Sequence, residues 1–179
     1  MKKLNISVST LIPAENNIAV SDNYHSLELV RLAPVWQEGL KRFFMDLKCN
    51  GDDIFFSPHL IDDFSLAKIS SCNGMDLYCI LVENNNILGY GLLRGWDDGY
   101  VIPSLGLAIH PLARGAGLGK FFMDFLHFQA FRRGASKVRL RVNKKNERAI
   151  ALYTSLGYLF EEDTKQVEFF VGFKSLGKE

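Results

Sequence analysis

The sequence predicts a mixed α/β domain in which helices cross over around one sheet. Three observations indicate this fold class. Helical and strand-like segments follow one another in the order β-α-α-β-β-β-α-β-α-β-β. The turn NNN at residues 84–86 separates two apolar runs, which is a hairpin signal. The glycine-rich stretch RGAGLG at residues 114–119 joins a strand directly to a long helix.

The first half of the chain supplies three strands and two helices. Leucines alternate over residues 26–33, which predicts a strand, and residues 34–48 carry apolar side chains at helical spacing with a proline in the first turn. Residues 61–70 are expected to form a short second helix. Residues 76–83 and 87–95 are the two strands of the hairpin.

The second half alternates strands and helices. An apolar strand over residues 100–110, broken by Pro103 and Gly106, enters the glycine stretch. The helix that follows has a broad apolar face and ends at Gly134. Residues 136–143 alternate valine or leucine with lysine or arginine, which predicts a strand. A short helix over residues 146–156 and a last strand over residues 165–174 complete the pattern.

Length and composition bound the class of protein. A chain of 179 residues with 47% hydrophobic content can bury one core, so we expect a single domain over residues 26–179, with residues 1–25 as an extension packed on it. The net charge of +1 offers no general attraction to nucleic acid or anionic membrane. The three cysteines form no CxxC pair and lack the spacing of a zinc site, which predicts free thiols, no bound metal and a reducing intracellular setting. With no cleavable leader and no membrane-length apolar run, we expect a soluble cytoplasmic protein.

The glycine stretch has the chemistry of an anion site. Glycine lets the backbone approach a ligand closely, and a helix N-terminus adds partial positive charge. A Walker loop is excluded because Arg114 and Phe121 stand where a glycine and a hydroxyl are needed. A dinucleotide fingerprint begun at Gly115 needs a glycine where Lys120 stands. The alternative to an anion site is a tight turn without a ligand.

The remaining pattern, RxxGxG at residues 114–119, resembles the acyl-coenzyme A loop of the GCN5-related N-acetyltransferase (GNAT) superfamily. The stretch NERAIALYTSLGY at residues 146–158 resembles the second signature of that family. The resemblance covers residues 76–173. It implies a mostly antiparallel sheet of six to seven strands flanked by about four helices, and acetyl-CoA as co-substrate.

The resemblance also implies which residues bind the cofactor. The backbone of the strand before the loop holds the pantetheine arm and the thioester carbonyl, successive loop amides cradle the pyrophosphate, and the tyrosine of the second signature protonates the coenzyme A sulfur as general acid. The leading asparagine of that signature contacts the pantetheine or a sheet backbone group, with a plain helix cap as the alternative. These residues are Leu107, Ala108, Ile109, Arg114, Gly115, Ala116, Gly117, Leu118, Gly119, Lys120, Asn146 and Tyr153.

The general base is left open by the residues. Many family members use a glutamate on the strand before the glycine loop, but VIPSLGLAI at residues 101–109 contains no carboxylate. Three options remain: Ser104 in a water relay, a carboxylate of Asp97 or Asp98, or His59. Asp97 and Asp98 also suit a turn before a glycine, and a histidine beside a proline is commonly structural.

The acceptor side is expected in two stretches, FFSPHL and LRGWDDGYVIPSLG, which are aromatic and carry both signs of charge. Carboxylates beside aromatic rings attract a cationic amine. Six basic residues cluster on and after the strand at residues 136–143. They are expected to form a solvated strand face, and the alternatives are contacts to the cofactor phosphates or to an acidic substrate. The acceptor candidates are Phe56, His59, Arg94, Trp96, Asp97 and Tyr100; the basic residues are Lys137, Arg139, Arg141, Lys144, Lys145 and Arg148.

The sequence therefore predicts an acetyl-CoA-dependent N-acetyltransferase that acts on a primary amine of a small metabolite or amino sugar. Direct attack in a ternary complex is expected, since neither signature contains a cysteine to carry the acyl group. A protein N-terminus or lysine as acceptor is the alternative within this class. A non-catalytic acyl-CoA sensor is the alternative from another class, and nucleic-acid binding is disfavoured by the net charge. A monomer or homodimer is expected.

Overall fold

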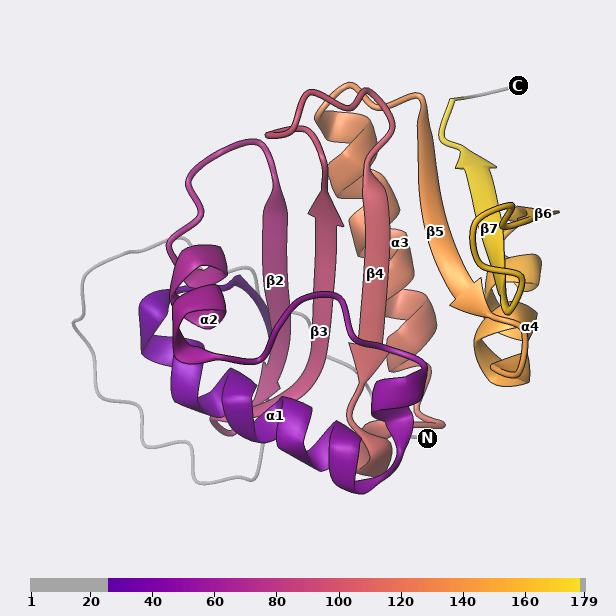
Figure 1. Ribbon diagram of the computed structural model, residues 1–179. Helices are drawn as coiled ribbons and strands as arrows, with labels where there is room; N and C mark the ends of the chain where they lie inside the picture. The colour runs from indigo at the N-terminus through magenta and orange to yellow at the C-terminus, as the bar shows by residue number, and fades with distance from the viewer. Residues whose placement is uncertain (1–25, 178–179) are drawn as a thin grey trace.

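A seven-stranded sheet in the order β1-β2-β3-β4-β5-β7-β6 organises the protein, seen here in a computed structural model that describes residues 26–177 (Figure 1). The expected extension at residues 1–25 lies outside the described residues. The strands are β1 (Leu27–Arg31), β2 (Leu77–Glu83), β3 (Asn86–Arg94), β4 (Ser104–Ile109), β5 (Lys137–Asn143), β6 (Leu159–Glu162) and β7 (Phe169–Ser175). The helices are α1 (Gln37–Cys49), α2 (Asp63–Ser70), α3 (Leu118–Arg132) and α4 (Glu147–Ser155), with short 3-10 turns η1 (Pro34–Trp36), η2 (Asp52–Ile54) and η3 (Pro111–Ala113).

The sheet is antiparallel throughout except between its central strands. β4 and β5 run parallel, and they pair at one register position, Ser104 opposite Arg139. Every other neighbouring pair is antiparallel over at least four positions. The predicted mixed, mostly antiparallel sheet of six to seven strands with about four helices is confirmed: the described residues form seven strands and four α-helices.

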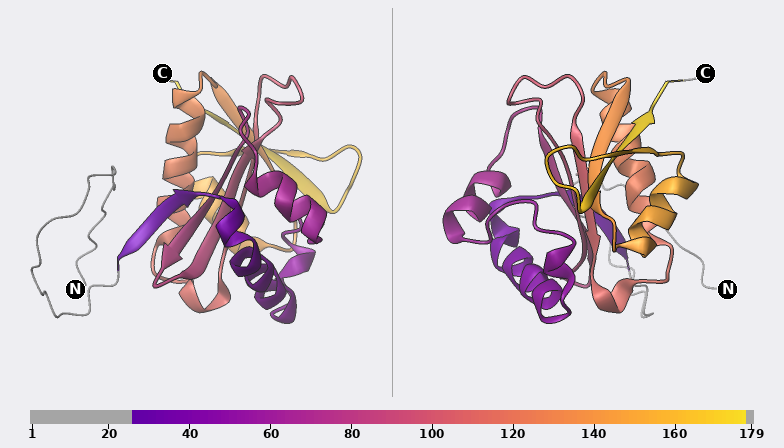
Figure 2. Two further views of the ribbon diagram at one scale, coloured as in Figure 1. Left: turned by 90° about the vertical axis from the view of Figure 1, so that its left-hand side faces the viewer. Right: turned by 45° about the vertical axis from the view of Figure 1, so that its right-hand side comes forward.

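Helices cover both faces of the sheet. α1 and α2 lie on one face, and α3 and α4 lie on the other (Figures 1 and 2). Phe122 of α3 packs so closely on β3 that a β-carbon at Gly91 would lie 2.8 Å from its ring. On the opposite face, Phe44 of α1 packs edge-on against Tyr90 of β3, with ring centroids 5.3 Å apart. Gly89 and Gly91 face α3 and leave room for the Phe122 ring, whereas Tyr90 between them faces α1 and fills the space on that side.

Two strand boundaries differ from the predicted ones. β4 begins at Ser104 rather than near residue 100, because the preceding residues form a loop whose last member, Pro103, has no N–H for the ladder. Pro103 instead accepts a hydrogen bond from the Arg139 N–H at 3.0 Å. β7 begins at Phe169 rather than at residue 165, because Asp163 accepts hydrogen bonds from the backbone of Lys165 and Gln166 and holds a turn there.

The predicted hairpin between β2 and β3 is confirmed, but its loop has two residues, because Asn86 of the predicted turn is the first residue of β3. Asn84 and Asn85 both have positive φ angles, 49° and 62°. This left-handed pair matches the twist of the flanking strands, and asparagine tolerates it better than most residues.

The expectation of free thiols is also confirmed. Cys49, Cys72 and Cys79 are all unpaired. Over residues 26–177 there is no helix with both the length and the apolar character needed to cross a bilayer. Within the same residues, no three histidine, cysteine or carboxylate side chains gather in a way that would hold a metal ion.

Candidate functional site

A cavity of about 550 Å³ lies where β4, the glycine loop, α4 and η2 meet. It has an apolar floor from the strand and helices and a rim of charged side chains. Every residue assigned to the cofactor by resemblance lines it except Ala116. Its lining is completed by Leu47, Asp52, Phe55, Phe56, Ala113, Lys145, Glu147, Arg148, Ala149 and Leu152. We call it the cofactor cavity.

The glycine loop turns free amides into this cavity. Gly115 and Gly117 have φ angles of +85° and +80°, a conformation in which other residues are strained. The first helical hydrogen bond of α3 runs from the Phe121 N–H to the Gly117 carbonyl at 3.1 Å, so the amides of residues 118–120 precede the helical ladder. These amides, with the partial positive charge of a 15-residue helix, fit the pyrophosphate of coenzyme A.

The side chain of Arg114 holds the loop in place rather than pointing into solvent. Its two terminal nitrogens bond the Asp52 carboxylate at 3.1 and 2.7 Å, and its Nε donates to the Ile109 carbonyl at 3.0 Å. Burial alone would raise the pKa of Asp52, but hydrogen bonds from Arg114 and Asn50 outweigh it and lower that pKa. Asp52, which sequence reasoning missed, therefore ties η2 to the glycine loop.

The backbone of β4 is open on the side of β5. The His110 N–H donates to the Leu88 carbonyl on β3, so by the alternation of an antiparallel pair Leu107 and Ile109 direct their amides the other way, toward β5. β5 pairs with β4 only at Ser104 and diverges beyond it. The Leu107 and Ile109 amides therefore face the opening between β4 and β5, and their role toward the pantetheine arm and the thioester carbonyl stays a prediction.

The two residues of the second signature that were assigned to the cofactor, Asn146 and Tyr153, line the same cavity at the start of α4 and within it. The Asn146 side chain accepts a hydrogen bond from the Ala149 N–H at 3.2 Å, so it caps the helix. Tyr153 is buried, with its ring 5.6 Å from that of Tyr158. Burial raises the pKa of Tyr153 to about 12, so the phenol is protonated at neutral pH but is a weaker acid than a free tyrosine.

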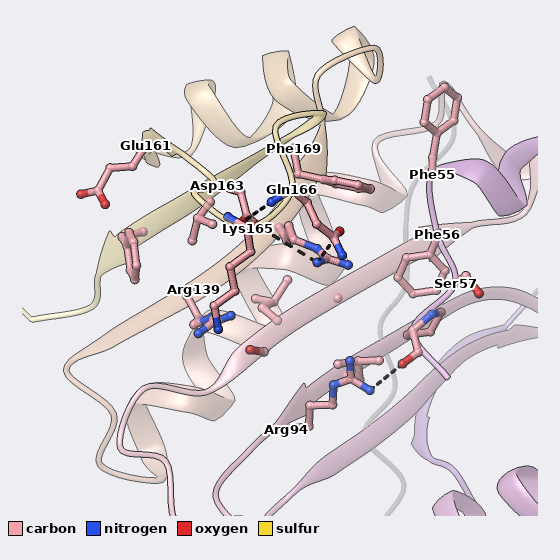
Figure 3. Close-up of a pocket in the computed structure, with 18 of the residues that line it drawn as sticks. Phe55, Phe56, Ser57, Arg94, Arg139, Glu161, Asp163, Lys165, Gln166 and Phe169 are labelled. Atoms are coloured by element: carbon pink, nitrogen blue, oxygen red, sulfur yellow. Dashed lines mark hydrogen bonds and ion pairs between the residues drawn. The ribbon is translucent and has the colours of Figure 1, made fainter. Parts of the chain in front are cut away.

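A second cavity, of about 700 Å³, lies beside the first on the sheet face that α1 and α2 cover only in part (Figure 3). Strands β3, β4, β5 and β7 form its floor, and the loop between β6 and β7 forms one wall. It shares Phe55 and Phe56 with the cofactor cavity, and the consecutive residues Gly106 and Leu107 line one cavity each. The two cavities therefore adjoin at the middle of β4. We call the second one the acceptor cavity.

Three residues predicted for the acceptor side or for catalysis lie here. Phe56 lines both cavities, and Arg94 and Ser104 line the acceptor cavity. Arg94 donates a hydrogen bond of 2.6 Å to the Pro58 carbonyl, which fixes the loop after η2 to the end of β3.

His59 lies next to this cavity but does not line it. Its Nδ1 is 2.9 Å from the Leu60 carbonyl, which can only accept, so Nδ1 carries the proton and Nε2 accepts from the Tyr90 hydroxyl at 3.0 Å. Burial lowers the pKa of His59 and favours this neutral form. Its basic nitrogen is thus already occupied within the fold, and a role as general base stays a prediction.

The remaining candidates lie on the loop between β3 and β4, where they line neither cavity. Asp97 accepts a hydrogen bond from the Met75 N–H at 2.7 Å and so joins two loops. Trp96 is half-buried with the Arg133 guanidinium 6.0 Å from its ring centre, and Asp98 and Tyr100 are exposed. The roles given to these four residues stay predictions, and the geometry does not bring them to the two cavities.

Asp53 is a carboxylate of the acceptor cavity that sequence reasoning missed. It is half-buried, and no other residue between 26 and 177 forms a hydrogen bond or ion pair with its side chain. It lies two residues after Gly51, which has a φ of +76° in the turn that follows α1. An aspartate near such a glycine is typical of turns, so the sequence gives no signal that Asp53 lines a cavity. The cluster of basic residues predicted from the sequence is divided between the two cavities. Arg139 and Arg141 line the acceptor cavity, whereas Lys145 and Arg148 line the cofactor cavity.

Comparison with known proteins identifies the class to which this chain belongs. The model of the acetyltransferase (GNAT) family matches residues 44–158. The chain belongs to this family, whose members are acetyl-CoA-dependent acyltransferases. No curated protein matches the chain in sequence.

Solved structures with the same fold include three informative ones. A GNAT-family acetyltransferase from Streptococcus pneumoniae is 18% identical with a TM-score of 0.69, covering 85% of this chain and 100% of its own. YncA from Salmonella typhimurium, solved with its cofactor acetyl-CoA, is 16% identical with a TM-score of 0.68, covering 86% and 95%. The ribosomal-protein-S18-alanine N-acetyltransferase from Escherichia coli is 18% identical with a TM-score of 0.65, covering 86% and 96%.

Proposed function

We propose that the protein transfers the acetyl group of acetyl-CoA to a primary amine of a small polar molecule, by direct attack in a ternary complex. The observation that carries this proposal is the junction of the two cavities at Gly106 and Leu107. A thioester held on the open backbone of β4 would meet an acceptor that enters from the opposite cavity. Neither cavity is lined by a cysteine that would carry an acyl intermediate.

Bound acetyl-CoA supplies the acetyl group as a thioester, so that a C–N bond to the acceptor forms while the C–S bond breaks. The Leu107 and Ile109 amides polarise the carbonyl that takes up negative charge. Tyr153 donates its phenolic proton to the departing sulfur. With a phenol pKa of about 12 and an ordinary thiol pKa near 8.5, this transfer is uphill by roughly 5 kcal/mol. Burial of the sulfur in the same cavity raises the thiol pKa as well and reduces that difference.

The amine must lose a proton as it attacks. Asp53 and Glu161 are the two carboxylates of the acceptor cavity without a hydrogen-bond or ion-pair partner in residues 26–177. The Glu161 carboxylate points out of the cavity (Figure 3), so we assign Asp53 as the base that takes this proton, directly or through water. Ser104, on the strand that also carries Leu107, is the second candidate through a water relay.

A small acceptor fits the acceptor cavity better than a protein does. The loop between β6 and β7 closes one side of it, and its lining carries both signs of charge. A protein amine remains the alternative acceptor, since one structural relative acetylates a ribosomal-protein alanine. A sensor that binds acyl-CoA without catalysis is the alternative from another class.

The test is release of free thiol from acetyl-CoA with a panel of amino sugars, polyamines, amino acids and short peptides, beside calorimetry with coenzyme A. Turnover with a small amine supports the proposal. Turnover with peptides alone would assign a protein acceptor. Tight coenzyme A binding without turnover across the panel would favour the sensor, and absence of coenzyme A binding would refute the proposal altogether.

A further inference from the structure

Three polar side chains form a row across the floor of the acceptor cavity. Arg94 on β3 stands opposite Ser104 on β4, and Ser104 stands opposite Arg139 on β5. All three line the cavity, so they point to the same face of the sheet. Because neighbouring strands lie about 4.8 Å apart, the two arginines are roughly 10 Å apart at their α-carbons, with a hydroxyl between them.

Within the described residues, 26–177, the two arginines of this row have no carboxylate partner. The Arg94 guanidinium donates to a neutral carbonyl, that of Pro58, and the Arg139 guanidinium has no hydrogen bond or ion pair with any other residue of the described chain. Arg141, two positions along β5, is different. It donates to Gln166 at 2.9 Å and lies 4.6 Å from the ring centre of Phe169. The row therefore holds uncompensated positive charge on the cavity floor.

The acidic residues of the cavity do not neutralise the row. Glu162 pairs with Lys144, and Asp163 accepts hydrogen bonds from two backbone amides of its own turn. The Glu161 carboxylate lies at the outer rim and points away from Arg94 and Arg139 (Figure 3). Asp53 is the remaining carboxylate of the lining.

Asp53 lies at the opposite end of the cavity from the arginines. The segment that carries it runs beside β4 in the reverse direction, as three contacts show. The Asp52 carboxylate bonds Arg114 just beyond the end of β4, the ring of Phe56 lies 3.3 Å from where a β-carbon at Gly106 would stand, and the Pro58 carbonyl accepts from Arg94 beside its start. Asp53 is therefore near the cofactor end, and the positive row is near the far end.

We propose, resting on the proposed acetyl transfer, that the acceptor is a small primary amine that also carries a carboxylate or phosphate, which Arg94, Ser104 and Arg139 bind. Asp53 faces the amine, and the thioester lies near Leu107. From Ser104 to Leu107 the strand rises three residues, roughly 10 Å. The anionic group and the amine of the acceptor are thus separated by several bonds, which excludes an α-amino acid whose own carboxylate is the group bound. Arginine suits this task because its fork of donors matches both anions.

The test compares amines that differ only in the anionic group: glucosamine 6-phosphate against glucosamine, and 6-aminohexanoate against hexylamine. Wild-type kcat/KM is expected to be at least about tenfold higher for the anionic member of the preferred pair. Preference for the phosphate or for the carboxylate pair identifies which anion is bound. Equal turnover of anionic and neutral amines would overturn the inference and leave the proposed acetyl transfer intact.

Arg139→Gln is the variant of choice because this exposed side chain has no hydrogen-bond or ion-pair partner among residues 26–177 whose loss would destabilise the protein. Lys137→Gln is the matched control, since it removes one charge from the same face of β5 outside the cavity. Arg139→Gln is expected to raise KM for the anionic amine about tenfold or more and to leave the neutral amine within twofold. An equal effect on both amines, or an equal effect of both variants, contradicts the inference.

Binding separates this inference from the proposed chemistry. Titration of the anionic amines into the protein with coenzyme A present should give binding that Arg139→Gln weakens and Lys137→Gln does not. That result without any turnover would support the anion site and reject acetyl transfer to these amines. Absence of anionic-amine binding, with coenzyme A bound, would reject the site.

Discussion

Replacing Gly117 by alanine separates the backbone strain of the glycine loop from its contact with the cofactor. Gly117 has a φ of +80°, and no heavy atom lies within 4 Å of where the new β-carbon would stand. The left-handed conformation destabilises an alanine by about 1–2 kcal/mol. Alanine also lowers the conformational entropy of the unfolded chain, which stabilises the folded state by about 0.4–1 kcal/mol. The net loss of about 1 kcal/mol corresponds to roughly 3 °C in Tm for a domain of this size.

Gly134, just after α3, is a matched control. Its φ is +83°, a β-carbon there also meets nothing within 4 Å, and it lines neither cavity. Gly134→Ala should therefore lose about the same Tm as Gly117→Ala. Only Gly117→Ala places a methyl group in the cofactor cavity, beside the amides at the start of α3, so only this variant should lose affinity for coenzyme A, by about tenfold or more.

Thermal unfolding and calorimetry with coenzyme A, on both variants and the wild type, give the two quantities. The reasoning is refuted if Gly117→Ala binds coenzyme A within twofold of Gly134→Ala at a similar Tm, because the loop would then be a turn without a ligand. A Gly117→Ala protein that fails to fold would refute the strain estimate itself.

Three further outcomes are expected. Tyr153→Phe should leave coenzyme A affinity within twofold and lower kcat about 100-fold or more, measured by thiol release; unchanged kcat would remove Tyr153 as proton donor. Asp52→Asn should lose stability at neutral pH, measured as Tm from pH 2 to 7. Because the pKa of Asp52 is lower in the folded protein than in the unfolded chain, the Asp52 carboxylate stabilises the fold at pH values above its unfolded pKa, near 3.9. This stabilisation disappears as the pH falls through the folded pKa. A Tm difference between Asp52→Asn and the wild type that does not change with pH would contradict this. Burial lowers the pKa of His127 to about 4, so between about pH 6.5 and pH 4 the unfolded chain binds a proton at this histidine that the folded protein does not. The Tm should therefore fall as the pH is lowered through this range, and His127→Gln should make the fall less steep. An equally steep fall in His127→Gln would show that His127 does not cause it.

Much of the fold is legible in the chain because its signals are local. Asparagines at 84 and 85 adopt the left-handed conformations that a two-residue hairpin needs, and Gly134 and Gly157 follow α3 and α4 with φ of +83° each. Apolar spacing places Leu40, Phe43, Phe44 and Leu47 on the buried side of α1. β4 and β7 begin later than the apolar runs that predicted them. The Pro103 carbonyl accepts a hydrogen bond from the Arg139 N–H and the Asp163 carboxylate accepts from the Lys165 N–H, and apolar patterning does not report such bonds.

The sequence by itself determined the family and the cofactor loop of this protein. That loop depends on a few consecutive φ angles and on the free amides that begin one helix, so adjacent residues specify it. Only the tertiary structure decided which residues form the acceptor cavity. Asp53, Arg94, Ser104 and Arg139 come from η2, β3, β4 and β5, and strand register and the path of the segment after α1 bring them together. The register and this path result from packing across the whole sheet, so no short stretch of the chain encodes the side of the site that selects the acceptor.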